Sequence, residues 1–460
     1  MTRAPITSAV AAFVSDFDIA AVPAPVLAYA RMLVFDGIGT LAAATHSLVT
    51  SSAGIGRFAE MHAGAGPATL IGQNRKADVV TAALANGTRG YAVDMEPHHP
   101  EAILHPVAVL GPVALALCEA GGRPGRHMIG AVVLGCEITY RVSMAMRPRE
   151  LYSLGFHPSA VCGTFGAAAA ASWLLGLDAA QTARALGLAG LQASGLMAWE
   201  DDPREDARPF QIGMAARNGV TAALLAGQGF GGPDRIFDGG HNVLHAFSRV
   251  AEPGKLVEGL GEAWDGVAEL AIKPYPCVSF LHPALDALAE LIAAHDIHAE
   301  QVEAVALRFA ASGAHCVDDN PLKSHCAQYV LPVRLARGGL VFTDLFQDLR
   351  ESDAEVARLA AATRVDRDAG EFDRLFPDVY AGEVTLTLKD GHEVSARRDV
   401  ARGYPETPLS QAEVEAKFDA LVGAVADDGR RQALKVAAAD VLDAPSVDVL
   451  AALLSKPANS

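Results

Sequence analysis

The segment from Asn86 to Pro106, NGTRGYAVDMEPHHPEAILHP, separates two apolar segments, residues 79–84 and 107–119, whose side chains recur at helical spacing. It contains three histidines and several acids, which a buried helix does not accommodate without polar partners. We therefore predict a helix, a polar loop that holds a site, and a second helix. Within the loop, Asn86-Gly87 predicts a turn.

Helical spacing extends over most of the first 265 residues, where alternation with a period of two is almost absent. A long helix is predicted at 128–146. Two capping boxes, Asp178 with Gln181 and Ser410 with Glu413, mark the starts of further helices. Most of the chain is therefore expected to be helical.

The pattern changes after residue 265. Residues 304–309 alternate as a strand does, and residues 382–397 form two alternating runs around Lys389-Asp390-Gly391-His392, which is a strong hairpin signal. Helices are predicted at 282–295, before the first of these strands, and at 353–364, between the strand and the hairpin. This part of the chain has the composition of a smaller α+β unit.

The predicted fold class is therefore mainly α. A large all-helical domain is built from both chain ends, residues 1–267 and 405–460, and a smaller α+β lid domain, residues 268–404, is inserted into it.

Composition limits the function. A net charge of −17 argues against a nucleic-acid partner, which needs a basic surface. The apolar run near the N-terminus is broken by Ser15 and Asp16, and the run at 163–177 stops near fifteen residues, so neither a signal peptide nor a membrane span is expected. Six cysteines without CxxC spacing fit a reducing, cytoplasmic location.

No phosphate-binding or dinucleotide-binding glycine motif is present. His241 and His245 stand four residues apart but have no third strong ligand nearby in the sequence, so no metal site is predicted. His105 and His157 each precede a proline at the start of an apolar helix, where free N–H groups favour anions. Each histidine could instead cap its helix and do nothing else.

Two cationic residues complete the set of candidates. Lys273 lies in the rigid segment Lys273-Pro274-Tyr275-Pro276-Cys277, which could equally be a surface linker. Arg208 ends a charged segment whose other members are expected to face solvent.

The sequence resembles the MmgE/PrpD family, which contains 2-methylcitrate dehydratase and cis-aconitate decarboxylase. The matching segments cover nearly the whole chain in the same order: Asn86-Gly87-Thr88 with Asp94; Ile103-Leu104-His105-Pro106; Gly155-Phe156-His157-Pro158; Gly163-Thr164-Phe165-Gly166; Gln192-Ala193-Ser194-Gly195; Gln228-Gly229-Phe230; Lys273-Pro274-Tyr275-Pro276-Cys277; His282-Pro283-Ala284; and Pro408-Leu409-Ser410.

The resemblance implies a homodimer, no metal or organic cofactor, and a pocket between the domains for a small anionic carboxylate. It places the family's site positions on Asp94, His105, His157 and Lys273.

This chain also departs from the family pattern. Glu96-Pro97-His98 replaces Asp-Asp-Thr, Arg208 and Gln211 stand where Lys and His are expected, and a lid tyrosine is replaced near Val333. We expect Arg208, His98 and Gln211 to bind substrate, with His98 and His99 as the first places to look for altered substrate choice. The alternative is that both histidines face solvent.

The leading hypothesis is a cofactor-independent lyase, a dehydratase or decarboxylase that acts on a di- or tricarboxylate. Lys273 and His105 would be the acid/base pair, His157 and Arg208 would bind carboxylates, and Asp94 would orient a histidine or act as a base. Two alternatives remain: an epimerase or isomerase of a polycarboxylate such as an iminodisuccinate-type acid, and an altered paralogue that only binds anions.

Overall fold

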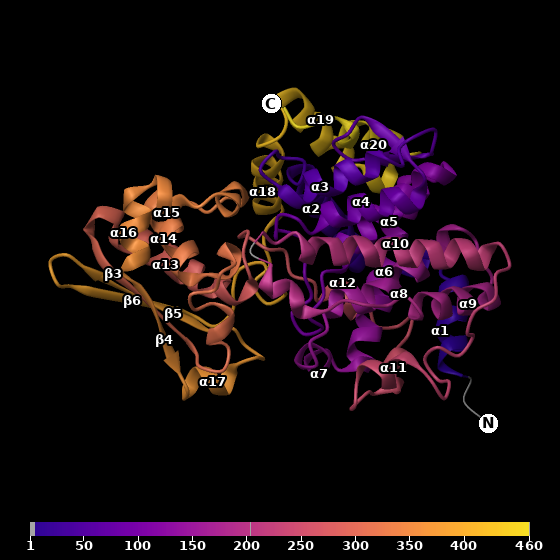
Figure 1. Cartoon of the computed structure of the whole chain (residues 1–460), viewed down its shortest axis with the longest axis horizontal. Helices are drawn as coiled ribbons and strands as arrows, with labels where there is room; N and C mark the ends of the chain where they lie inside the picture. The colour runs from indigo at the N-terminus through magenta and orange to yellow at the C-terminus, as the bar shows by residue number, and fades with distance from the viewer. Residues whose placement is uncertain (1–4, 203, 460) are drawn as a thin grey trace. The chain divides into compact units, whose positions relative to one another are not determined.

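The computed structural model describes residues 5–202 and 204–459. The chain divides into two compact units, one from residues 1–271 and 410–460 and one from residues 272–409. The predicted mainly α fold class is confirmed, because helices dominate both the indigo-to-magenta and the yellow parts of the ribbon in Figure 1.

The first unit is helical apart from one short hairpin. Its helices are α1 (Ile6–Ser15), α2 (Ala24–Ala43), α3 (Thr50–Glu60), α4 (Val79–Gly90), α5 (Pro106–Gly121), α6 (Gly125–Met146), α7 (Pro148–Ser153), α8 (Pro158–Leu174), α9 (Ala179–Gly190), α10 (Ala207–Gly227), α11 (Val243–Phe247), α12 (Asp265–Ala268), α18 (Gln411–Gly423), α19 (Asp428–Ala439) and α20 (Asp448–Ser455). The hairpin pairs β1 (Ala68–Leu70) with β2 (Arg75–Ala77).

The centre of this unit is formed by α4, α5, α6, α8 and α10, which pack against one another. The small side chains of α8 are buried almost throughout, which lets neighbouring helices approach closely. Two helices, α2 and α6, are long and apolar enough to cross a membrane, but 67% and 89% of their apolar windows are buried. That burial is typical of core helices.

The predicted turn at Asn86-Gly87 is wrong, because α4 continues through both residues to Gly90. The Asn86 side chain accepts a hydrogen bond from the Ile71 amide and donates one to the Thr69 carbonyl. A Cβ on Gly87 would lie 3.0 Å from the Cα of Gly213. Tertiary contacts with β1 and α10 therefore override the local turn preference of this pair.

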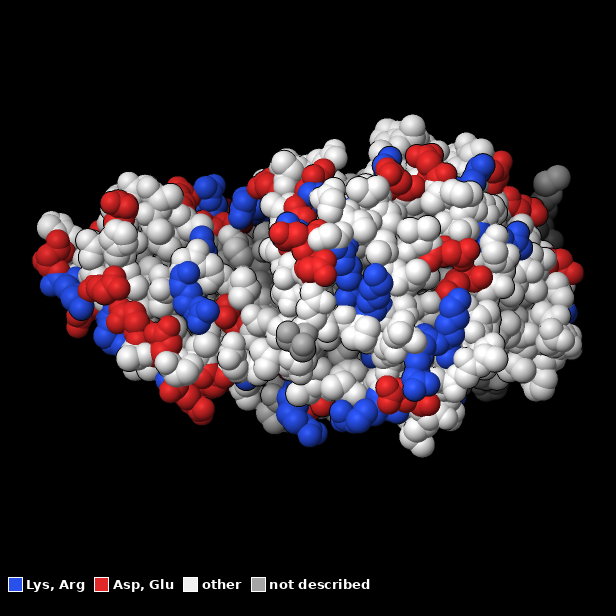
Figure 2. Space-filling model, turned by 90° about the horizontal axis from the view of Figure 1, so that it is seen from above, with Lys and Arg blue, Asp and Glu red and all other residues white. Residues whose placement is uncertain are grey.

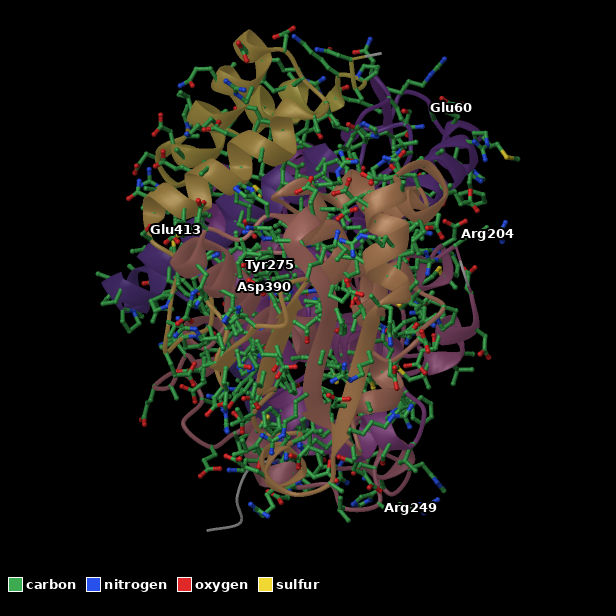
Figure 3. The ribbon with its side chains drawn as sticks, turned by 90° about the vertical axis from the view of Figure 1, so that its left-hand side faces the viewer. Glu60, Arg204, Arg249, Tyr275, Asp390 and Glu413 are labelled. Carbon is green, nitrogen blue, oxygen red and sulfur yellow. The ribbon has the colours of Figure 1, made fainter. Side chains whose placement is uncertain are left out.

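Both predicted capping boxes are present, at the starts of α9 and α18. In the second, the Glu413 backbone amide donates to the Ser410 hydroxyl and the Ser410 backbone amide donates to the Glu413 carboxylate. Figure 3 labels Glu413 at the beginning of α18. The following helix, α19, begins without a capping box and was not predicted.

The second unit, orange in Figure 1, is built around a four-stranded sheet in the order β4-β3-β5-β6. The strands are β3 (Val302–Ala310), β4 (Thr363–Asp368), β5 (Gly382–Leu388) and β6 (Glu393–Arg398). Its longer helices are α13 (His282–His295), α14 (Ala327–Arg337) and α16 (Ala354–Ala361), accompanied by the short α15 (Leu349–Ser352) and α17 (Glu371–Leu375). The predicted strand at 304–309 and the predicted hairpin are confirmed.

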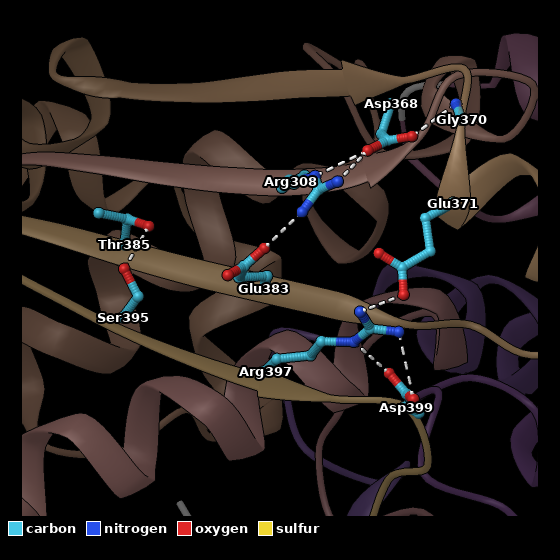
Figure 4. Close-up of polar contacts among 9 residues, drawn as sticks. All are labelled: Arg308, Asp368, Gly370, Glu371, Glu383, Thr385, Ser395, Arg397 and Asp399. Atoms are coloured by element: carbon cyan, nitrogen blue, oxygen red, sulfur yellow. Dashed lines mark hydrogen bonds and ion pairs between the residues drawn. The ribbon is translucent and has the colours of Figure 1, made fainter.

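The sheet buries one face and exposes the other. Val305, Leu307 and Phe309 are buried under the helices, as the alternation predicts. On the other face, Arg308 of β3 contacts both Asp368, at the end of β4, and Glu383 of β5 (Figure 4). β4 was not predicted; it pairs in parallel with β3 and carries mostly charged residues.

Acidic and basic side chains alternate in small clusters on the face drawn in Figure 2, between larger uncharged areas. No continuous basic surface is visible on that face, which agrees with the net charge of −17.

Candidate active site

The polar segment between α4 and α5 is irregular but buried. His98 pairs with Ala271 through two backbone hydrogen bonds of 2.9 and 2.7 Å, and His99 pairs in the same way with Leu104. Asp94 and Ile103 have left-handed backbones, with φ of +54° and +53°. Non-glycine residues rarely adopt this conformation, and such strain often accompanies functional sites.

His105 and His157 lie next to the N-termini of α5 and α8, as the His-Pro pairs predict. Neither side chain caps its helix. Instead, the backbone amide of His105 donates to the Ser159 hydroxyl in the first turn of α8. The two helix starts are thereby held together, and both histidines lie beside the ring of Tyr91, at centroid distances of 4.8 and 5.9 Å.

Glu96 is the direct partner of His105. Its Oε1 lies 2.8 Å from His105 Nδ1, and its side chain is 1% exposed. A carboxylate at this distance favours a proton on the ring nitrogen that faces it, here Nδ1, because the opposite charges attract. The His98 ring stacks on that of His105 at a centroid distance of 5.8 Å. The structure therefore brings the predicted residues His98, His105 and His157 into one cluster with Glu96.

His157 is neutral in this setting. Burial, with the nearby charges of His105 and Arg208, lowers the pKa of His157 to about 3, while the Gln211 amide acts in the opposite direction. Gln211 is itself held by a 2.7 Å hydrogen bond from Nε2 to the Leu196 carbonyl. A neutral imidazole can orient a substrate oxygen by donating an N–H, but it does not carry a positive charge.

Arg208 is buried between two carboxylates and two aromatic rings. Its Nη2 lies 2.7 Å from Glu205 and its Nη1 3.4 Å from Asp94. The guanidinium carbon stands 5.1 Å from the Tyr91 ring centre and 5.4 Å from that of Trp199. Burial acts to lower the pKa of Arg208, but Asp94 and Glu205 outweigh it and raise the pKa. Asp94 therefore faces Arg208, and a role for Arg208 in binding substrate stays a prediction.

The solvent-facing alternative for His98 and His99 is wrong. They are 5% and 1% exposed. His99 Nδ1 accepts a hydrogen bond from the Ala102 amide, so its Nε2 carries the proton and donates to the Asp265 carbonyl. Burial lowers the pKa of His99 to about 4, and a part in substrate choice stays a prediction for both histidines.

Lys273 and Val333 belong to the second unit. Lys273 is the second residue of that unit and Val333 lies on α14, fully buried. The role of Lys273 in the site stays a prediction.

Four residues of the first unit were absent from the predicted site: Tyr91, Glu96, Asp36 and Lys417. Asp36 is a single acid in the apolar α2, and Lys417 lies on α18, where its Nζ is 2.8 Å from Asp36. An isolated charge inside an apolar helical run is the sequence signal that points to such a buried pair. Among the described residues, no group of three or more His, Cys, Asp and Glu side chains is arranged to hold a metal ion.

The cluster therefore offers a carboxylate–imidazole pair, two further histidines and a compensated guanidinium. These groups can take up and deliver protons and donate hydrogen bonds to a carboxylate.

Comparisons with known proteins show to which family the chain belongs. The cis-aconitate decarboxylase-like protein oryM of Aspergillus oryzae is 28% identical over 98% of this chain and 97% of its own length. The cis-aconitate decarboxylase of Aspergillus terreus is 26% identical over 92% and 91%, and the human enzyme of that name 27% over 82% and 79%. The chain matches the MmgE/PrpD N-terminal domain over residues 8–255 and the MmgE/PrpD C-terminal domain over residues 275–442. It therefore belongs to the MmgE/PrpD family.

Proposed function

We propose that this protein is a lyase that removes CO2 or water from a small di- or tricarboxylate. The observation that carries the proposal is the Glu96–His105 pair, 2.8 Å apart and flanked by His98 and His157. Two relatives that match this chain over most of their length are named cis-aconitate decarboxylase, and this supports the same class of reaction.

Both reactions need a group that moves a proton next to a carboxylate. In decarboxylation, the bond to the departing carboxylate breaks, CO2 leaves, and the electron pair remains on carbon until a proton arrives. In dehydration, a base removes a C–H proton while an acid protonates the departing hydroxyl. Histidine suits either role near neutral pH.

We assign the acid/base roles to His105 and Lys273. Glu96 holds the proton on Nδ1 of His105, which leaves Nε2 as the nitrogen that exchanges a proton with substrate. His157, which stays neutral, donates a hydrogen bond to a substrate carboxylate together with Gln211 and His98. Asp94 orients Arg208, and Arg208 contributes positive charge without giving up its proton. Cofactor independence, a homodimer and a cytoplasmic location stay predictions.

A second candidate function is epimerisation of a related acid. Arg208 stands where the family pattern has a lysine, and it is held by Asp94 and Glu205. A guanidinium cannot serve as a proton donor to a leaving group, and epimerisation has no leaving group.

One NMR series in D2O separates these functions. The purified protein is mixed with candidate di- and tricarboxylates, cis-aconitate first, and spectra are followed with time. We expect loss of CO2 or water from one of them. Deuterium incorporation with inversion at carbon, without loss of CO2 or water, would contradict the lyase proposal and support the epimerase. Thermal stabilisation by a carboxylate without any turnover would show a binding protein and contradict both.

A further inference from the structure

A buried ion pair contacts the polar segment between α4 and α5. Asp36 of α2 is 0% exposed and Lys417 of α18 is 9% exposed. The Nζ atom of Lys417 lies 2.8 and 2.9 Å from the two carboxylate oxygens of Asp36. Next to the pair, Phe35 stacks on Phe418 with 4.4 Å between ring centres, so two segments that are far apart in the sequence are held in a fixed register.

Stability alone accounts poorly for this pair. Removing two charges from water costs free energy that their mutual attraction offsets only in part, so well-packed apolar side chains usually stabilise a core as well or better. Both α2 and α18 already have apolar residues around the pair. The charges therefore point to a further task.

Lys417 also contacts the polar segment between α4 and α5. Its Nζ donates a 2.7 Å hydrogen bond to the Met95 carbonyl. Met95 stands between Asp94, whose backbone is left-handed, and Glu96, whose carboxylate contacts His105. A strained backbone keeps its conformation only where neighbouring contacts hold it, and the Lys417 ammonium supplies such a contact at the peptide next to Glu96.

We propose that Asp36 and Lys417 are positioning residues that hold the Met95 carbonyl and so keep Glu96 on the Nδ1–H of His105. Asp36 fixes the ammonium, the ammonium fixes the peptide, and the peptide fixes the carboxylate. Loss of this support frees Glu96 to move, and the His105 proton then distributes over both ring nitrogens. The inference deepens the proposed function, because it concerns the same histidine, but its test does not require turnover.

Several other titratable groups surround His105. Tyr91 and His98 lie on its own segment, His157 lies directly before α8, and Arg208 lies on α10. They are left unchanged in the variants below, so that a change at His105 reports on the Asp36–Lys417 pair.

The test is NMR of the ring nitrogens in histidine-labelled protein, with the His105 signal assigned by its loss in His105→Gln. The two informative variants are Lys417→Met and the double variant Asp36→Asn/Lys417→Met. The double variant removes both charges of the pair, so it keeps the test decisive if Lys417→Met alone does not fold. In the wild type we expect the Nδ1–H form to dominate above the titration of His105. In both variants we expect a mixture with the Nε2–H form.

Asp36→Asn alone should leave the tautomer of His105 unchanged but lower the midpoint of its titration. The amide oxygen of the new Asn still accepts a hydrogen bond from Lys417, so the ammonium stays on the Met95 carbonyl and the tautomer stays as in the wild type. Loss of the Asp36 negative charge makes the surroundings of His105 more positive and its protonation less favourable, so the midpoint of its titration falls by roughly 0.5–1 pH unit. Lys435→Met is the matched control, because Lys435 pairs with Asp419 and Glu415 on the outer side of α18 and α19, and it should change neither quantity.

A folded double variant with the wild-type tautomer ratio would overturn the proposal, whatever its melting temperature, because the pair would then have no influence on His105. A protein that turns over no carboxylate, yet shows the expected tautomer change, would refute the proposed function and leave this inference standing.

Discussion

Glu96 sets the charge next to His105, and its removal should move the pH dependence of catalysis. In Glu96→Gln the amide oxygen still accepts the Nδ1–H, but the negative charge is lost. A carboxylate at 2.8 Å favours the imidazolium, so His105 in the variant keeps its proton only at lower pH. We expect the acid limb of kcat/KM to shift down by about 1 pH unit or more.

The matched control is Glu252→Gln, which removes a carboxylate that pairs with Arg147 at the surface, where both side chains are about half exposed. It should leave the profile unchanged, and an unchanged profile in Glu96→Gln as well would remove His105 as the group that titrates in catalysis.

His99 should make the first unit sensitive to acid. Its pKa is about 4 in the folded protein and 6.5 ordinarily, so the unfolded chain binds the proton more tightly. Stability is therefore full above pH 6.5 and falls as the pH drops from 6.5 to about 4. The total is roughly 3 kcal/mol at 1.36 kcal/mol per pKa unit. His99→Gln, whose amide can still accept from Ala102 and donate to the Asp265 carbonyl, should show a flatter loss of unfolding free energy between these pH values. A slope equal to that of the wild type would contradict the buried, neutral state of His99.

For single residues, the sequence predicts which side chains cluster better than it predicts the contacts that each of them makes. Three predicted residues contact the Tyr91 ring, namely His105, His157 and Arg208. The fourth, Asp94, contacts Arg208. Glu96 was noticed only as a departure from the family pattern. Its contact with His105 depends on a left-handed residue at Asp94, which no spacing rule indicates.

Among the elements, the crossing of α4 and α10 places Arg208 beside the polar segment. A Cβ on Gly213 would lie 2.2 Å from Thr88 Oγ1 and 2.4 Å from the Leu84 carbonyl, so Gly213→Ala must push the two helices apart. We expect a loss of about 1–3 kcal/mol in unfolding free energy, together with weaker activity, because Arg208 lies on the same helix. Chemical denaturation monitored by circular dichroism measures the first effect.

Gly54→Ala provides the control for that substitution. Gly54 lies within α3, and nothing stands within 4 Å of an added Cβ. Alanine is the better helix former, so this variant should be unchanged or more stable by up to about 1 kcal/mol. Equal losses in the two variants would show that close packing at Gly213 is not the cause.

The elements that the sequence predicts are those with local signals. The capping boxes at Asp178 and Ser410 and the alternation at 304–309 act within a few residues, and all three are present in the structure. β4 was missed because its residues are mostly charged and it forms only by pairing in parallel with β3. The predicted turn at Asn86-Gly87 was wrong for the reverse reason, since contacts with β1 and α10 outweigh a local preference.

For the whole molecule, the central question is whether one step of the reaction uses both units. His105 lies in the unit of residues 1–271 and 410–460, and Lys273 in the unit of residues 272–409. If they are the acid and base of one proton-transfer step, each alanine variant should lose about 10²–10⁴-fold in kcat. The kcat of the double variant should then be hardly lower than that of the less active single variant, because a step that has lost one partner gains little from the other.

Lys389→Ala, at the hairpin turn of the second unit, is the matched control and should retain full activity. Steady-state kinetics on the four proteins, with circular dichroism to verify folding, completes the cycle. Losses that simply multiply in the double variant would mean that the two residues act in separate steps, and near-normal rates in either single variant would remove that residue from the mechanism.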